Sequence, residues 1–288
     1  MGNALPLSSA TMSAYPLVIH RVEKPWGRKK LWPGFDDPQP NTAPIGEIIF
    51  GDKGDGALCI KYLFTAEKLS IQVHPNDLQA REAGYPSGKD EAWVILDAED
   101  GATIGLGLKH DTSREALEAA AREGSLESLL DLRPVKAGDV IYSPAGTIHA
   151  IGAGITLLEV QQNVDLTYRL YDYGRPRPLH LDAGLTVAVP GRHTHTNRYR
   201  AFDVDRIILC EGGMFVLERW TWNGARNLNL PERVSGWFAP LQGSGTVDGA
   251  AFAGGECWRL DGSMSIEMAR GSECLFAYPL PDPLPLFG

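Results

Sequence analysis

The chain has 288 residues, of which 43% are hydrophobic and 22% are charged, and these proportions are ordinary for a globular protein with one large or two modest domains. Its formal net charge is -9, which argues against nucleic acid as the main partner, because phosphate backbones bind to positively charged surfaces. A small phosphorylated ligand is compatible with this charge, since a few local cations can outweigh a distant acidic field.

The chain begins with residues 1–18, which we expect to form a flexible tail. This stretch is mostly small or polar and lacks the basic start and apolar core of a signal peptide. No run approaches the ~20 consecutive apolar residues that a membrane helix needs. The four cysteines are scattered without a Cys-x-x-Cys pair, a pattern typical of free thiols in a reducing compartment. We therefore expect a cytoplasmic protein without a membrane partner.

Most of the following chain is expected to be β-structure, because 32 glycines and 20 prolines separate short runs rich in Val, Ile, Leu and aromatic residues. The predicted strands of this part cover residues 47–50, 57–64, 69–73, 91–96, 102–106, 140–143, 149–151, 156–162 and 167–171. Residues 111–132 interrupt them with good helix formers behind N-cap candidates. Gly124 is expected to end a first helix, and Ser125 to begin a second short one.

A second β-rich block begins near Tyr199, with strands predicted at 202–210, 214–222, 236–241, 245–248, 257–260, 265–268 and 274–278. Helices do not alternate with these strands, which argues against a parallel βαβ architecture and favours a barrel or double-sheet jelly roll. We expect a mainly β protein with a first domain over residues 19–195 and a smaller β domain over residues 196–288. The second domain contains no histidine and is expected to be free of metal.

A first polar row lies in the strand predicted at residues 69–73. Because side chains alternate along a strand, Ser70, Gln72 and His74 are expected on the face opposite to Leu69, Ile71 and Val73. In a small barrel such an inward row can surround one ligand. Taken alone, the same row also fits the exposed face of an amphipathic edge strand.

A second row, Lys89, Glu91 and Trp93, shares one face of the next strand by the same alternation. A lysine beside a carboxylate is usually a solvated surface pair. If Glu91 binds a metal ion, however, the positive charge is expected to depress the pKa of Lys89, which favours a neutral amine or a phosphate partner.

A third segment has a more specific spacing: Gly138, five residues, then Pro-x-Gly, two residues, and His149. This spacing is similar to the second signature of the cupin jelly-roll superfamily, and predicts a cupin-type barrel. The first cupin signature is altered, because Gln72 replaces its leading histidine and the gap to Glu91 is longer. Gln72, His74, Glu91 and His149 are an amide, a carboxylate and two imidazoles, which suit a divalent metal such as zinc and leave room for a substrate oxygen.

A polar strand over residues 157–175 follows. Glu159 and Gln161 alternate with apolar residues and share one face, and Arg169 and Arg175 are planar cations suited to a phosphate or carboxylate. A surface network of ion pairs that joins Glu159, Asp165 and Arg169 is the alternative interpretation.

Four separated motifs together resemble the type I mannose-6-phosphate isomerases in their short bacterial form. They are Ser-x-Gln-x-His-Pro (70–75), Lys-x-Glu-x-Trp (89–93), Gly-Thr-Ile-His-Ala-Ile-Gly-x-Gly (146–154) and Glu-Val-Gln-Gln-x-x-Asp-x-Thr-Tyr-Arg-x-Tyr-Asp-Tyr-Gly-Arg (159–175). The resemblance is continuous over residues 22–176 and weak beyond. Val164 departs from it, because many members have serine at this position.

This resemblance implies that one zinc ion per chain is bound by Gln72, His74, Glu91 and His149. It places Arg169 at the active-site arginine, Ser70 and Lys89 near the substrate, and Glu159 among the pocket acids. The implied reaction interconverts mannose 6-phosphate and fructose 6-phosphate through an enediol.

The residue roles remain partly open at this point. Lys89 or Glu159 could transfer the proton, and Arg169 could stabilise the enediolate or hold the phosphate, a task that Lys89 could share. The alternatives to this enzyme are another metal-dependent cupin, either an isomerase of an unphosphorylated sugar or a dioxygenase, and a non-catalytic sugar-binding cupin. We expect a small phosphorylated sugar as partner and a monomer or homodimer.

Overall fold

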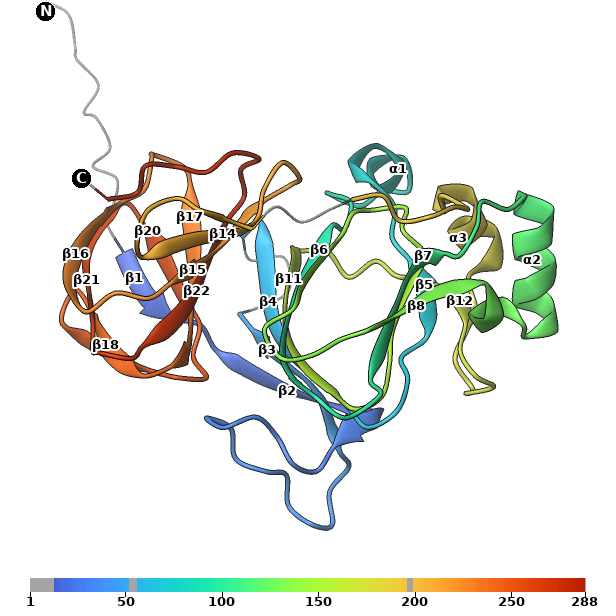
Figure 1. Ribbon diagram of the computed structural model, residues 1–288, viewed down its shortest axis with the longest axis horizontal. Coiled ribbons are helices and arrows are strands. Elements are labelled where there is room, and N and C mark those ends of the chain that lie inside the picture. Colours follow the sequence, from blue (N-terminus) through green and yellow to red (C-terminus); the bar gives the residue numbers. More distant parts are fainter. Residues whose placement is uncertain (1–12, 52–55, 196–198, 288) are drawn as a thin grey trace, which may run out of the picture.

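Two β-rich bodies lie side by side in the computed structural model, which describes residues 13–51, 56–195 and 199–287 (Figure 1). The first body is built from chain segments before residue 195, and the second mainly from segments after residue 199. All four cysteines are buried free thiols. Within the described residues, no helix is long and apolar enough to cross a membrane.

The first body consists of two antiparallel sheets that face each other. The six-stranded sheet has the order β2 (Ile19–Arg28), β3 (Ile45–Phe50), β4 (Leu58–Thr65), β11 (Ile155–Gln162), β6 (Glu91–Ala98) and β9 (Val140–Ser143). The five-stranded sheet has the order β12 (Tyr168–Tyr171), β5 (Ile71–Val73), β10 (His149–Ile151), β7 (Thr103–Leu108) and β8 (Leu130–Pro134). This arrangement agrees with the predicted mainly β barrel.

Helices cover the outer face of the five-stranded sheet (Figure 1). They are α2 (Arg114–Glu123), the 3-10 helix η1 (Leu126–Leu129) and α3 (Leu181–Val187), whereas the short helix α1 (Asp77–Glu82) packs through Ala80 against Val164 and Leu166. The predicted helical insert is confirmed by α2 and η1. Ser113 caps α2 by accepting a hydrogen bond from the backbone N–H of Ala116, and Gly124 ends the helix in a left-handed conformation. Sequence analysis missed α1 and α3, which are short and lack a clear helical period.

The second body has a seven-stranded and a four-stranded sheet. The first has the order β1 (Ser13–Pro16), β20 (Trp258–Asp261), β17 (Ser235–Gln242), β22 (Glu273–Tyr278), β15 (Val216–Trp220), β14 (Arg206–Cys210) and β13 (Arg200–Ala201). The second has the order β16 (Gly224–Asn229), β21 (Ser263–Met268), β18 (Ser244–Val247) and β19 (Ala250–Ala253). A core rich in Trp and Phe fills the space between these sheets.

The predicted flexible tail is wrong for residues 13–16. These residues form β1, which pairs antiparallel with β20 and so satisfies the edge of the seven-stranded sheet. No local pattern in the sequence predicts this pairing, because β20 lies more than 240 positions away from β1 in the chain. Residues 1–12 lie outside the described part of the chain, as do residues 196–198, where the two domains were expected to meet; that boundary stays a prediction.

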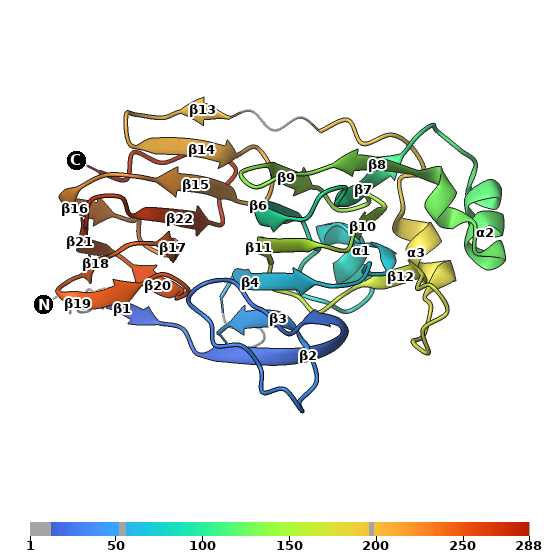
Figure 2. The ribbon, with the colours of Figure 1, turned by 60° about the horizontal axis from the view of Figure 1, so that its bottom comes forward.

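A continuous apolar layer joins the two bodies. Tyr62 and Leu158, from the six-stranded sheet, belong to the same buried cluster as Leu217 and Leu275 from the seven-stranded sheet. Figure 2 shows β14, β15 and β22 lying next to β6 and β9. The opposite faces of β4, β6 and β11 point into the first barrel, so this layer supports the strands that line its interior.

The second body also buries an ion pair. Arg206 donates two hydrogen bonds of 2.8 Å to Glu218, which further accepts from Trp220 Nε1 at 2.7 Å and from Tyr278 Oη at 2.8 Å. Tyr278 Oη in turn accepts from the backbone N–H of Leu284. Because both charges are fully buried, these partners together satisfy groups that would be costly to leave unpaired.

Candidate metal centre and substrate pocket

The inward row of the six-stranded sheet changes from apolar to polar along its strands. Trp93 and Leu157 belong to an apolar cluster inside the barrel, whereas Glu91, Lys61 and Glu159 lie towards its polar end. The strand register places Glu159 directly between Lys61 on β4 and Trp93 on β6. The barrel therefore has a packed apolar interior at one end and charged groups at the other.

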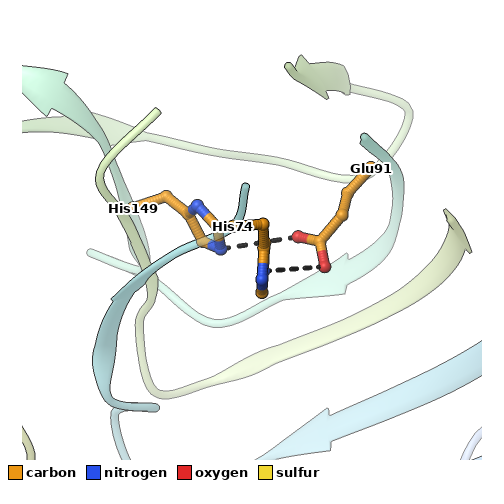
Figure 3. Close-up of side chains that lie close together, drawn as sticks. All are labelled: His74, Glu91 and His149. Atoms are coloured by element: carbon orange, nitrogen blue, oxygen red, sulfur yellow. Dashed lines mark ion pairs between the residues drawn. The ribbon is translucent and has the colours of Figure 1, made fainter. Parts of the chain in front are cut away.

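Segments from both sheets bring the predicted metal ligands together at this polar end. His149 on β10 lies opposite Gln72 on β5 in the strand register, His74 directly follows β5, and Glu91 begins β6. Figure 3 shows that the side chains of His74, Glu91 and His149 converge. Their ligand atoms lie within 4.8 Å of one another, and all three side chains are buried.

The Nε2 atoms of the two histidines lie close to the carboxylate oxygens of Glu91. His74 Nε2 lies 3.1 Å from Glu91 Oε1, and His149 Nε2 lies 3.4 Å from Glu91 Oε2. Within the described chain, His74 Nε2 and both carboxylate oxygens of Glu91 lack a hydrogen-bond partner of good geometry, although they lie within ion-pair distance. Buried polar atoms are rarely left in this state, so an additional group is expected between them.

The remaining ring nitrogens are held by backbone carbonyls. His74 Nδ1 donates to the carbonyl of Leu166 at 2.9 Å, and His149 Nδ1 donates to that of Thr147 at 3.0 Å. These bonds fix the ring orientations and leave a lone pair on each Nε2. The lone pair of His74 Nε2 has no hydrogen-bond partner of good geometry in the described chain, and that of His149 Nε2 also faces the amide of Gln72. A converging pair of Nε2 atoms and a carboxylate fits a divalent metal ion.

The charges also suit metal binding. Burial lowers the pKa of His74 to about 4, assisted by the Lys89 ammonium, and burial likewise lowers the pKa of His149. Burial by itself would raise the pKa of Glu91, but Lys89 and the two imidazoles hold that pKa well below its usual range. At neutral pH the site therefore consists of two neutral imidazoles and one carboxylate, the forms that bind metal.

Gln72 and Lys89 lie beside these three residues. The side-chain nitrogen of Gln72 is 3.2 Å from His149 Nε2, and its oxygen accepts from Ser70 Oγ at 3.3 Å. A turn of the amide would direct that oxygen towards the imidazole, so the role of Gln72 as a fourth ligand stays a prediction. Lys89 Nζ lies 2.8 Å from Glu91 Oε1 and is almost fully buried.

A cavity of about 270 Å³ opens next to the cluster. The predicted site residues that line it are Ser70, Gln72, Lys89, Glu91, Glu159 and Arg169. His74 and His149 are not part of its lining and lie behind it. The structure thus places the predicted metal ligands and the predicted substrate and catalytic residues either in the cavity wall or in the ligand cluster at its base, whereas Arg175 lies outside both.

Glu159 occupies a buried position in this wall. Its Oε1 accepts from Trp93 Nε1 at 3.0 Å, and its Oε2 lies 3.2 Å from Lys61 Nζ. Burial and the nearby charge of Glu91 raise the pKa of Glu159, against the effect of Lys61. Glu159 is therefore buried and bonded to Trp93 and Lys61, so the alternative interpretation as a surface ion-pair network with Asp165 and Arg169 is wrong for this residue. Sequence analysis missed Lys61, although a lysine alternating with apolar residues in a buried strand was a usable signal.

Two arginines line the cavity at some distance from this pair. Within the described residues, the guanidinium of Arg169 makes no hydrogen bond or ion pair, and burial and the neighbouring Arg177 lower its pKa. Arg177 is held by buried Asp172 through bonds of 2.6 and 2.8 Å. Arg175, predicted as a cation for a phosphate, instead packs near the ring of Tyr173 and does not line the cavity. Arg177 lies in an irregular segment and gave no sequence signal.

Fold and site together define an antiparallel β-barrel protein with a buried His–Glu–His site of the kind that binds metal, at the base of a cavity that holds both acids and cations. No family model matches the chain. The chain is 40% identical over 193 residues to mannose-6-phosphate isomerase ManA of Bacillus subtilis, a match that covers 62% of this chain and 61% of that relative. It is 32% identical over 250 residues to mannose-6-phosphate isomerase of Streptococcus mutans, covering 78% of each.

Solved structures of mannose 6-phosphate isomerases are also similar to the chain. The mannose 6-phosphate isomerase of Bacillus subtilis superposes with a TM-score of 0.77 at 26% identity, over 93% of this chain and 99% of that one. A zinc-bound mannose 6-phosphate isomerase superposes with a TM-score of 0.69 at 13% identity, over 93% and 100%, a likeness that shows the fold. The chain belongs to the mannose-6-phosphate isomerase family. The aligned part spans less than two thirds of the length of ManA.

The lowered histidine pKa values predict that metal affinity resists acid. Two exposed histidines with the ordinary pKa of about 6.5 would together lose about 100-fold in affinity by pH 5.5, because protons compete with the metal. Here the pKa of His74 is about 4 and that of His149 lies below its ordinary value, so we expect a loss of less than about tenfold between pH 7.5 and 5.5. Competition with a chelator of known protonation behaviour measures this, and a 100-fold loss would contradict the description of the site.

Proposed function

We propose that the protein is a zinc-dependent aldose–ketose isomerase that interconverts mannose 6-phosphate and fructose 6-phosphate through an enediol. One observation carries the proposal: ligand atoms of His74 and Glu91 without a hydrogen bond of good geometry lie at the base of a cavity whose walls hold a buried acid and an arginine that is unpaired among the described residues. Membership of the family supports the choice of substrate. The zinc-bound structure of a protein with the same fold supports the choice of metal.

His74, Glu91 and His149 would hold the metal, with the amide oxygen of Gln72 as a fourth ligand. When bound, zinc supplies a Lewis acid for the negative charge that develops on the sugar oxygens. Lys89, which is buried beside Glu91, contributes a second positive charge at the same end of the cavity. Together these residues surround a place where an oxyanion is more stable than in water.

Proton transfer between C1 and C2 needs a base in the cavity wall. Glu159 suits this role, because burial and the charge of Glu91 raise its pKa above the ordinary value of a carboxyl group, which favours reversible protonation. Trp93 and Lys61 orient its two oxygens. Lys89 is tied to Glu91 at 2.8 Å and is better placed to donate to a substrate oxygen.

The phosphate would bind to the arginines. Arg169 has a guanidinium that is partly buried and is unpaired among the described residues, so a phosphate can supply the missing acceptor oxygens. The neighbouring Arg177, which Asp172 holds in place, lies close enough to lower the pKa of Arg169 and adds to the positive potential beside it. Ser70, which donates to Gln72 and lines the cavity, is available for a sugar hydroxyl.

A coupled assay of mannose 6-phosphate conversion tests the activity. The zinc-loaded protein is expected to be active, to lose activity after chelation and to regain it when zinc is restored, because the metal stabilises the developing charge. The variant His149→Ala should be inactive, whereas His110→Ala, at an exposed position outside the site, should match the parent protein. Absence of activity in the zinc-loaded protein would overturn the proposal and favour unphosphorylated sugars or another metal-dependent reaction.

The variant Glu159→Gln tests the base. Glutamine keeps the size of the side chain and an acceptor for Trp93 but cannot accept the proton, so we expect kcat to fall by about 10²- to 10⁴-fold. Zinc content, measured by metal analysis of the purified variant, should remain at the parent value. A kcat within about tenfold of the parent would exclude Glu159 as the base and assign the role to Lys89.

The variant Arg169→Gln tests the phosphate site. A hydrogen bond to a charged group contributes about 1.5–3 kcal/mol, so KM for mannose 6-phosphate should rise roughly 10- to 150-fold with a smaller change in kcat. Arg175→Gln is the matched control, because Arg175 is a neighbouring arginine that does not line the cavity. Equal effects of the two substitutions on KM would contradict the assignment.

A further inference from the structure

Asp90 stands between two residues of the site but faces away from the cavity. Lys89 and Glu91 line the cavity, whereas the side chain of Asp90 is buried on the other side of the chain. Its Oδ1 accepts from the backbone N–H of Ala145 at 2.8 Å, and its Oδ2 accepts from the hydroxyl of Tyr142. No step of the proposed reaction uses this carboxylate, so its burial calls for another explanation.

The contact with Ala145 joins two ligand-bearing segments. Ala145 belongs to the turn between β9 and β10, and this turn leads directly to His149. Backbone hydrogen bonds make two similar connections: Gly146 N–H donates to the carbonyl of His74 at 2.8 Å, and Lys89 N–H donates to that of Pro75 at 3.1 Å. Hydrogen bonds therefore connect the segments that carry His74, Glu91 and His149 to one another close to the ligand atoms.

Tyr142 connects this arrangement to the second body. Its hydroxyl donates to Asp90 and accepts from the backbone N–H of Met214 at 3.3 Å, in the turn between β14 and β15. At the neighbouring Gly213, an added Cβ would come within 1.8 Å of the Tyr142 hydroxyl, so this close approach requires glycine. Tyr142 is itself buried and packs on Phe215 with ring centroids 5.8 Å apart.

We propose that Tyr142 and Asp90 are positioning residues of the metal site, and that the second body holds the site in its binding geometry through them. The inference rests on the metal site of the proposed function. Metal binding requires ligand distances within about 0.2 Å of their preferred values, so small displacements of the β9–β10 turn reduce affinity. Residues that orient the ligands typically change metal affinity by about 10- to 100-fold when they are replaced.

The variant Tyr142→Phe tests the inference, because it removes the hydroxyl and keeps the ring in its packing site. We expect zinc affinity, measured by chelator competition, to fall about tenfold. Tyr278→Phe is the matched control. Tyr278 is also a buried tyrosine whose hydroxyl donates to a carboxylate, that of Glu218, and accepts from a backbone N–H, that of Leu284, but it lies in the core of the second body.

Both variants should lose a similar amount of unfolding free energy in urea denaturation of the metal-free proteins, because each loses the hydrogen bonds of one buried hydroxyl. Only Tyr142→Phe should lose zinc affinity. Parent-like zinc affinity of Tyr142→Phe, or an equal loss in both variants, would overturn the positioning role while leaving the proposed function intact. Failure of the parent protein to bind zinc would overturn both proposals.

A second variant keeps the test decisive if Tyr142→Phe does not fold. Asp90→Asn has nearly the same shape and keeps an oxygen acceptor for the backbone N–H of Ala145, but replaces the charged acceptor of the Tyr142 hydroxyl. It is expected to lose zinc affinity in the same direction and by less than tenfold, with the kcat of the zinc-saturated enzyme close to the parent value. Parent-like affinity of Asp90→Asn would contradict the inference.

Discussion

The charge of Glu91 is the constraint on which the site depends. A carboxylate that is 1% exposed is unstable unless other charges and hydrogen bonds replace the water it has lost. Lys89 and the two imidazoles surround it, and the unpartnered lone pair of His74 shows that protein groups alone do not complete the arrangement. A divalent cation would balance the charge of the carboxylate and bind the Nε2 lone pairs of the histidines. The buried charge of Glu91, which is unfavourable for folding, therefore prepares the site for metal.

The architecture makes this arrangement rigid. Strands β4, β6 and β11 present one face to the barrel interior and the other to the apolar layer shared with the second body. Displacing Glu91 or Glu159 would therefore disturb packed side chains such as Tyr62 and Leu158 on the opposite face, and closely packed interiors resist such changes. In this way the second body, which contributes no predicted ligand, supports β6, the strand that begins with Glu91.

Much of the site could be predicted from the sequence, because its spacing and alternation are local properties. Strands β9 and β10 begin and end where they were expected, and the alternation along residues 69–74 placed Gln72 and Ile71 on opposite faces, as observed. The residues that escaped prediction depend on distant contacts. Lys61 becomes part of the site only because β11 pairs with β4 and brings Glu159 beside it. Residues 13–16 form a strand only because they pair with the edge of β20. Arg177 reaches the cavity from an irregular segment, for which no periodicity exists.

The charge of the cavity differs from that of the chain as a whole. A net charge of -9 suggests repulsion of a phosphorylated sugar, yet the cavity is lined by Lys24, Lys61, Lys89, Arg169 and Arg177. Three of these cations are already neutralised: Lys24 is paired with Glu47, Lys61 with Glu159, and Arg177 with Asp172. Arg169 is unpaired among the described residues, and Lys89 would have to share Glu91 with a bound metal. Arg169 lies opposite Gln72 in the strand register and Lys89 lies beside Glu91, so the positive charge available to a ligand is concentrated next to the predicted metal ligands, where an anionic substrate and its developing oxyanion would require it.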